Sequence, residues 1–265
     1  MKAVQQDMTS GSPMKIILSF TFPIFLGNVF QQFYNMADAV IVGKFVGTGA
    51  LAAVGSTGTI MFLIYGFVVG MTAGFTVLTA QKFGAGDMDA MRKTVAGASV
   101  LSLIIGAVLT AAFMLLMKPW LELMNTPEDI FRDAYSYIMI ISAGILAQML
   151  YNLLASILRA LGNSRVPLYF LILSALLNIV LDLVLIIFFH MGTAGAAVAT
   201  VISQGMSGLL CLGYIVKAVP ALRLHREDWH LSGSLLGIQL RIGIPMALQY
   251  SITAIGTMMV QSSLN

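Results

Sequence analysis

Two carboxyl side chains stand within long apolar runs, and of all the residues in this sequence they are the best placed to do chemistry. Asp38 is the only charged residue between positions 16 and 43, and Asp182 is the only one between 166 and 216. A charge at the centre of an apolar span costs roughly 2.5–3.5 kcal/mol on an insertion scale. Because no lysine or arginine lies at similar depth, each carboxyl group is expected to be protonated or to bind a cation. Both states are typical of a site that couples to H⁺ or Na⁺, and we predict no cofactor besides that ion.

Uncharged polar residues share a helix face with each acid. Residues three or four apart lie on the same side of a helix. This spacing places Asn28, Gln31 and Asn35 in line with Asp38, and Ser174 and Asn178 in line with Asp182. Two other apolar runs carry similar stripes: Gln148, Asn152, Ser156 and Arg159 in one, and Thr193, Thr200, Gln204 and Ser207 in the other.

These stripes predict a cation site and a cavity beside it. Lipid offers no hydrogen-bond partner, so polar stripes must face the bundle interior or water. Carboxylate, amide and hydroxyl oxygens suit a hard cation. The predicted cation-coupling residues are Asp38, Asn178, Asp182, Thr200 and Asn152, with Na⁺ possible at the first four. The predicted cavity residues are Asn28, Gln31, Asn35, Gln148 and Gln204. The alternative is that the amides serve only to join helices by hydrogen bonds.

The elements that must position these residues are membrane helices. The chain has 265 residues, of which 58% are hydrophobic and 9% charged. Soluble domains carry about 25% charged residues, and disordered chains need low hydrophobicity, so both classes are excluded. A span needs about 20 apolar residues. This rule predicts seven spans, at residues 14–42, 48–80, 92–117, 128–160, 166–189, 194–217 and 235–264.

The basic residues predict the orientation of these spans. With the N-terminus inside, eleven lysines and arginines fall on the inner side and three, Lys44, Lys118 and Arg132, on the outer side. The inner set is Lys2, Lys15, Lys82, Arg92, Lys93, Arg159, Arg165, Lys217, Arg223, Arg226 and Arg241. Such a bias indicates a multi-pass protein with a cytoplasmic N-terminus.

An internal repeat predicts two units. Leu18, Phe20, Phe22, Pro23 and Leu26 match Leu240, Ile242, Ile244, Pro245 and Leu248, each at an offset of 222 residues. The even number of spans between the copies preserves orientation, as in transporters built from two six-helix halves. We therefore expect residues 1–231 to form a six-helix N-terminal lobe with an inner linker. Residues 232–265 are then the first helix of a second lobe, and we expect the chain to be a fragment.

Three spaced motifs resemble one known family, the multidrug and toxic compound extrusion (MATE) transporters. The region joining their helices 1 and 2 is similar to Asn35-Met36-Ala37-Asp38, Val42-Gly43, Gly47 and Leu51-Ala52-Ala53. Their helix 4–5 connection is similar to Leu158-Arg159-Ala160-Leu161-Gly162-Asn163-Ser164-Arg165-Val166-Pro167. The start of their helix 6 is similar to Met191-Gly192-Thr193-Ala194-Gly195-Ala196-Ala197-Val198-Ala199-Thr200.

The resemblance implies an all-α membrane protein with twelve helices in two lobes, in a bacterial plasma membrane. It implies export of organic, often cationic or amphipathic, compounds in exchange for Na⁺ or H⁺, and a need for the second lobe. In the subgroup with a cation site in the first lobe, the site corresponds to Asp38, Asn152, Asn178, Asp182 and Thr200, and all five residue types are present. The expected partners are small organic molecules and the lipid bilayer, with no nucleic acid.

Three other functions are alternatives for a chain with this acid pair. A lipid-linked precursor flippase of the same wider superfamily would share the topology but would be favoured by basic residues at membrane depth, which this sequence lacks. An intramembrane aspartyl protease resembles Tyr-Asp or Gly-x-Gly-Asp in context, whereas here Ala37 precedes Asp38 and Leu181 precedes Asp182. A channel would leave the repeat and the acid pair unexplained. We therefore predict an antiporter and not an enzyme.

Overall fold

The computed structural model describes residues 12–264, apart from the side chains of residues 253–255 and 257–264. Two parts of the predicted lobes lie outside the described residues: residues 1–11 of the first lobe, which include Lys2, and Asn265 of the second. The described chain is helical, without strands. Its helices are α1 (Pro13–Phe45), α2 (Thr48–Gly84), α3 (Met88–Leu123), α4 (Glu128–Ala143), α5 (Ile145–Ala160), α6 (Arg165–Leu183), α7 (Gly192–Ala218) and α8 (Gly233–Leu264).

The observed helices confirm the predicted all-α membrane fold. Among the described residues, five helices (α1, α2, α3, α6 with the turn that follows it, and α7) are long and apolar enough to cross a membrane. The bent pair α4 and α5 would make a sixth. The seventh predicted span coincides with α8.

The predicted single span at residues 128–160 is wrong in one respect, because it is broken at Gly144. The axes of α4 and α5 differ by 47°. A Cβ atom at Gly144 would lie 2.3 Å from Cγ2 of Val201 in α7, so only glycine lets Val201 approach this closely. The break is therefore caused by packing against a helix that follows 48 positions later in the chain, which local sequence does not reveal.

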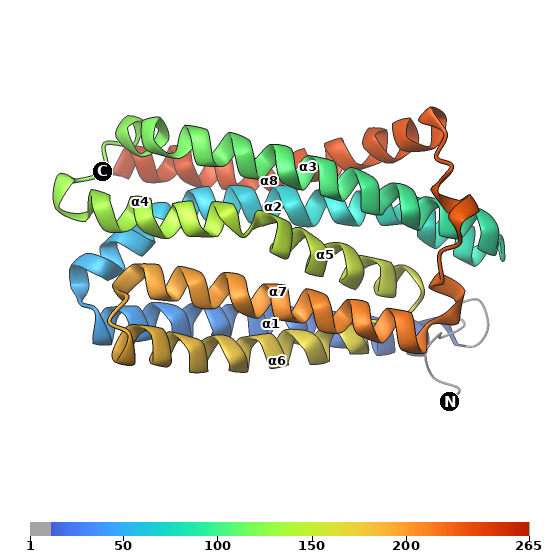
Figure 1. The fold of residues 1–265 in the computed structure, drawn as a ribbon, viewed down its shortest axis with the longest axis horizontal. Helices are drawn as coiled ribbons and strands as arrows, with labels where there is room; N and C mark the ends of the chain where they lie inside the picture. The colour runs from blue at the N-terminus through green and yellow to red at the C-terminus, as the bar shows by residue number, and fades with distance from the viewer. Residues whose placement is uncertain (1–11, 265) are drawn as a thin grey trace.

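The helices run roughly parallel to one another, with α2 in the middle of the bundle (Figure 1). Helices α1, α6 and α7 lie on one side of α2, and α3 and α8 lie on the other. The apolar core includes Ile60, Ile64, Val68 and Phe75 of α2, all of them buried. Helix α2 thus contacts both the group of α1, α6 and α7, which carries the two acids, and the group of α3 and α8.

The alternating helix directions give the bundle two distinct ends. The turns at residues 85–87 and 161–164 and the linker at 219–232 lie at one end, which we call the basic end. The turns at 46–47, 124–127 and 189–191 lie at the other, which we call the acidic end. The acidic end holds Glu122, Glu128, Asp129 and Asp133 and only three basic residues. The ten described basic residues of the predicted inner side belong to the basic end.

Candidate functional site

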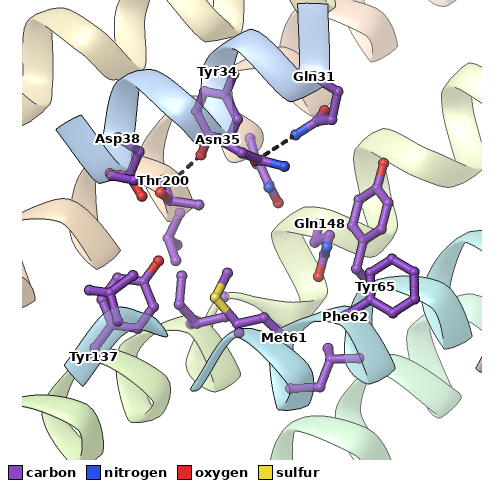
Figure 2. A pocket seen from close by; sticks show the side chains of 18 of the residues that line it. Gln31, Tyr34, Asn35, Asp38, Met61, Phe62, Tyr65, Tyr137, Gln148 and Thr200 are labelled. Carbon is purple, nitrogen blue, oxygen red and sulfur yellow. Dashed lines mark hydrogen bonds between the residues drawn. The ribbon is translucent and has the colours of Figure 1, made fainter. Parts of the chain in front are cut away.

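A cavity of about 380 Å³ opens between α1, α2, α7 and the α4–α5 bend. Its wall segments are the acidic-end halves of their helices, such as residues 31–39 of α1 and 54–65 of α2. Four of the five predicted cavity residues line it: Gln31, Asn35 and Gln148, which Figure 2 labels, and Gln204. The fifth, Asn28, is exposed on α1 and is not part of the wall.

The two membrane acids meet at one side of this cavity. Asp38 lies in its wall, and the carboxyl group of Asp182 in α6 is within hydrogen-bonding reach of the Asp38 carboxyl group. Asp38 is 8% exposed and Asp182 is fully buried. Two carboxylates cannot donate to each other, so this contact requires a proton or a cation between them. Asp182 occupies the last turn of α6, directly before a turn of π-helix at Val184–Phe188.

Asn178 joins the acid pair to α7. It lies one turn before Asp182 and is fully buried. In the amide orientation that satisfies both polar atoms, its Nδ2 donates to Oδ2 of Asp182 at 3.0 Å. Its Oδ1 accepts from the backbone nitrogen of Thr200 at 3.2 Å. The amide therefore fixes the distance between α6 and α7 at the level of the acids.

Tyr34 completes a polar chain across the site. Its hydroxyl donates to Oγ1 of Thr200 at 2.9 Å (Figure 2). On the same helix, Gln31 Nε2 donates to Oδ1 of Asn35 at 3.5 Å. Hence α1 is connected to α7 through Tyr34 and Thr200, and α7 to α6 through Asn178.

Asn152, the fifth predicted coupling residue, lies apart from the acid pair. It lines a separate cavity of about 20 Å³ together with Tyr34 and Ser174. Its Nδ2 donates to the backbone oxygen of Gln148, one turn earlier in α5, at 2.8 Å. Tyr34 and Gln204 border both cavities, so the two cavities are neighbours. The structure thus brings Asp38, Asn178, Asp182 and Thr200 together and places Asn152 in the neighbouring cavity.

Three tyrosines line the site, although none of them is among the predicted coupling or cavity residues. Tyr34 lies one turn before Asp38 on the same helix face, a spacing that could have identified it. Tyr137 is almost fully buried and lies close enough to both acids to interact with them electrostatically. Tyr137 belongs to α4 and Gln148 to α5, and both line the cavity although the helix is broken between them. Tyr65 of α2 forms another part of the wall.

The arrangement offers oxygen atoms and no positive charge. None of the ion pairs among the described residues involves Asp38 or Asp182. One buried carboxyl oxygen of each acid, Oδ1, has no hydrogen-bond partner. The described residues contain no group of three histidine, cysteine or acidic side chains that could hold a transition metal. Two carboxyl groups with neutral oxygens around them can accept a proton or a small hard cation.

Known proteins provide a comparison for this geometry. A family model described as MatE matches residues 23–184. The probable multidrug resistance protein YpnP of Bacillus subtilis (strain 168) is 34% identical over 262 residues, which cover 98% of this chain and 58% of the relative. The chain thus spans about half the length of the curated relatives it matches.

Two solved structures show the same fold. An outward-facing conformation of a multidrug resistance MATE family transporter of the MOP superfamily has a TM-score of 0.88 at 27% identity. The match covers 97% of this chain and 57% of that one. An inward-facing conformation with the same description has a TM-score of 0.81 at 27% identity, and that match covers 88% of this chain and 53% of the other.

Proposed function

Because this chain belongs to the MatE family of membrane transporters, we propose that the whole protein exports organic compounds in exchange for a cation and that this chain carries the coupling site. The observation that carries the proposal is the contact between Asp38 and Asp182 in the wall of a cavity, with no basic partner for either among the described ion pairs. Loading a cation there would favour one arrangement of the helices over another, which is what coupling requires.

The site residues divide into two groups in this proposal. Asp38 and Asp182 receive the ion, Thr200 provides a neutral oxygen beside them, and Asn178 holds Asp182 in place through its amide nitrogen. Asn152 supports the site from the neighbouring small cavity. The ion is Na⁺ or H⁺, and both fit two carboxyl groups with unpartnered oxygens.

The cavity supports an amphipathic substrate. Its size falls within the range of about 300–1,000 Å³ that drug-sized ligands occupy. Apolar and aromatic side chains such as Met61, Phe62 and Tyr65 form much of the wall, and Gln31 and Gln148 add hydrogen-bonding groups. Asp38 would attract a positive charge. YpnP is named as a probable multidrug resistance protein, which agrees with organic, often cationic, compounds as substrates. The names of the relatives do not favour a lipid-linked precursor flippase.

We also infer an outward-facing arrangement. The cavity lies in the acidic-end half of the bundle, and the positive-inside rule makes the basic end cytoplasmic in the bacterial plasma membrane. The match to the outward-facing transporter covers more of the chain than the match to the inward-facing one. The family is a transporter family, and we propose that the protein catalyses no chemical step.

Drug efflux from proteoliposomes that contain the full-length protein tests this function. A Na⁺ gradient at equal pH and a pH gradient without Na⁺ are applied separately. We expect one of the two to drive efflux and Asp38→Asn to abolish it. Asp133→Asn, which changes an exposed acid at the acidic end, is the matched control and should leave efflux unchanged. Efflux that is independent of both gradients would contradict the proposal.

A further inference from the structure

Three neighbouring helices each present an exposed cation at the basic end of the bundle. Lys15 lies in the first turn of α1, Arg165 is the first residue of α6, and Lys217 lies in the last turn of α7. All three side chains are exposed, and none of the ion pairs among the described residues involves them. We call these residues the basic triplet.

Helix α6 carries an exposed stripe that begins at the triplet. This helix packs against both α1 and α7 (Figure 1). Its exposed residues lie three or four positions apart and so share one face: Arg165, Tyr169, Leu173, Leu176 and Val180. From the basic end inward, the stripe changes from a cation to an aromatic ring and then to aliphatic side chains. The same order marks the headgroup, interface and hydrocarbon layers of a membrane.

The flanking helices α1 and α7 show the same pattern. On α1, Lys15 is followed by Leu18 and Phe22, which are both exposed. On α7, Lys217 is preceded by Leu210 and Met206, about two and three helical turns earlier, and both are exposed. Each of the three helices thus has an apolar outer surface that ends in a cation at the basic end.

The three cations lie at similar depths. The hydrogen bond between Tyr34 and Thr200 marks a common level for α1 and α7. At about 1.5 Å per residue, Lys15 lies roughly 28 Å and Lys217 roughly 26 Å from that level toward the basic end. Asn178 contacts Thr200, and the same rise places Arg165 roughly 20 Å from it. A long arginine side chain can extend toward the level of the two lysines.

This surface is separate from the candidate site and from α8. None of its residues lines either of the two cavities. Helix α8 packs on α2 and α3, on the other side of α2. The described acids of the basic end belong to the start of α3 and to the linker. Three of them pair there: Asp87 with Lys82, and Asp89 and Asp228 with Arg92. The described protein therefore offers the triplet no counter-charge.

We propose that the basic triplet and the apolar surface beside it bind an anionic phospholipid of the leaflet at the basic end. The phosphate lies among the three cations, and the acyl chains lie along the exposed residues of α1, α6 and α7. Basic residues at a membrane surface attract anionic headgroups. The adjoining apolar stripes favour a lipid over a free phosphate or a soluble acidic partner, because only a lipid covers both parts of the surface.

Lipid binding to the purified full-length protein tests this proposal. Native mass spectrometry from detergent compares the dissociation constants of phosphatidylglycerol and phosphatidylcholine. We expect the wild-type protein to prefer phosphatidylglycerol. The triple variant Lys15→Gln, Arg165→Gln, Lys217→Gln should bind it at least about tenfold more weakly, because each basic residue at a membrane surface contributes roughly fivefold to binding.

The matched control removes three exposed cations from the acidic end: Lys44→Gln, Lys118→Gln, Arg132→Gln. Its affinity for phosphatidylglycerol should stay within about twofold of the wild-type value, since the loss of net charge is the same but the site is intact. Equal weakening by the two glutamine triples would refute a site at the basic triplet. Equal binding of the two lipids by the wild-type protein would do the same.

A charge-conserving variant separates the loss of charge from misfolding. Lys15→Arg, Arg165→Lys, Lys217→Arg should retain the preference for phosphatidylglycerol, and loss of the preference would contradict recognition by charge. Inorganic phosphate at the same concentration should not displace the lipid. Displacement would indicate a plain anion site and overturn the proposal. These measurements involve no transport, so their outcome does not depend on the proposed coupling.

Discussion

At the scale of single residues, Asp38 and Asp182 should behave as one unit because their carboxyl groups are in contact. We expect Asp38→Asn and Asp182→Asn each to reduce gradient-driven efflux to background in full-length protein. The double mutant should be no worse than either single mutant, since residues that act as a unit are non-additive. Neither change should lower the melting temperature, because removing a buried charge removes its desolvation cost. Wild-type efflux in both single mutants would exclude this pair as the coupling centre.

The hydrogen bond between Tyr34 and Thr200 allows a second test at the same scale. Tyr34→Phe and Thr200→Val each remove one partner of the 2.9 Å contact while keeping most of the side-chain volume. Each should reduce ion-coupled efflux by about fivefold, the equivalent of roughly 1 kcal/mol for a neutral hydrogen bond. The combination should be little worse than either alone. Tyr169→Phe, on the exposed surface of α6, serves as the control. Strictly additive effects would show that the two side chains act separately.

At the scale of elements, the α4–α5 bend depends on one glycine. Gly144→Ala places a methyl group against Val201, which we expect to lower the free energy of unfolding by about 1–3 kcal/mol, as in overpacked cores. The double change Gly144→Ala with Val201→Ala should recover much of that loss, because it removes the γ carbons that clash. Thermal unfolding in detergent measures both. Gly213→Ala on α7, where a Cβ atom meets open space, should have little effect. An unchanged melting temperature for Gly144→Ala would contradict this account of the bend.

Helix positions were predictable because apolar length is a local property. The span predicted at residues 48–80 is α2 at Thr48–Gly84, and the one predicted at 194–217 is α7 at Gly192–Ala218. The break at Gly144 was not predictable, because Val201, which requires it, belongs to another helix. A glycine within an apolar span does not by itself predict a bend, since α3 contains Gly106 and is unbroken.

At the scale of the whole molecule, the distribution of charge predicts the orientation. Ser12 and Asn125 lie at the basic and acidic ends, respectively, and both are exposed. In a cysteine-free background with Cys211→Ala, Asn125→Cys should react with an impermeant thiol reagent added to intact cells. Ser12→Cys should react only after the membrane is opened. The positive-inside rule gives the physical reason. Labelling of both positions in intact cells would reverse or refute this topology.

The sequence alone shows the charge-free apolar runs and the two isolated acids. The apolar runs determined the all-α membrane class and the positions of the helices. Asp38 and Asp182 could be identified as unusual because the cost of placing a charge in lipid does not depend on the neighbouring helices. The roles predicted for the site residues remain predictions. Only the tertiary structure decided which polar stripes meet: Asn152 faces a separate small cavity, and Tyr34 and Tyr137 join the acids. Helix contacts such as Gly74 against Gly243 or Gln239 against Thr94 join residues about 145–170 positions apart. Their geometry depends on how whole helices cross, and no local pattern specifies that.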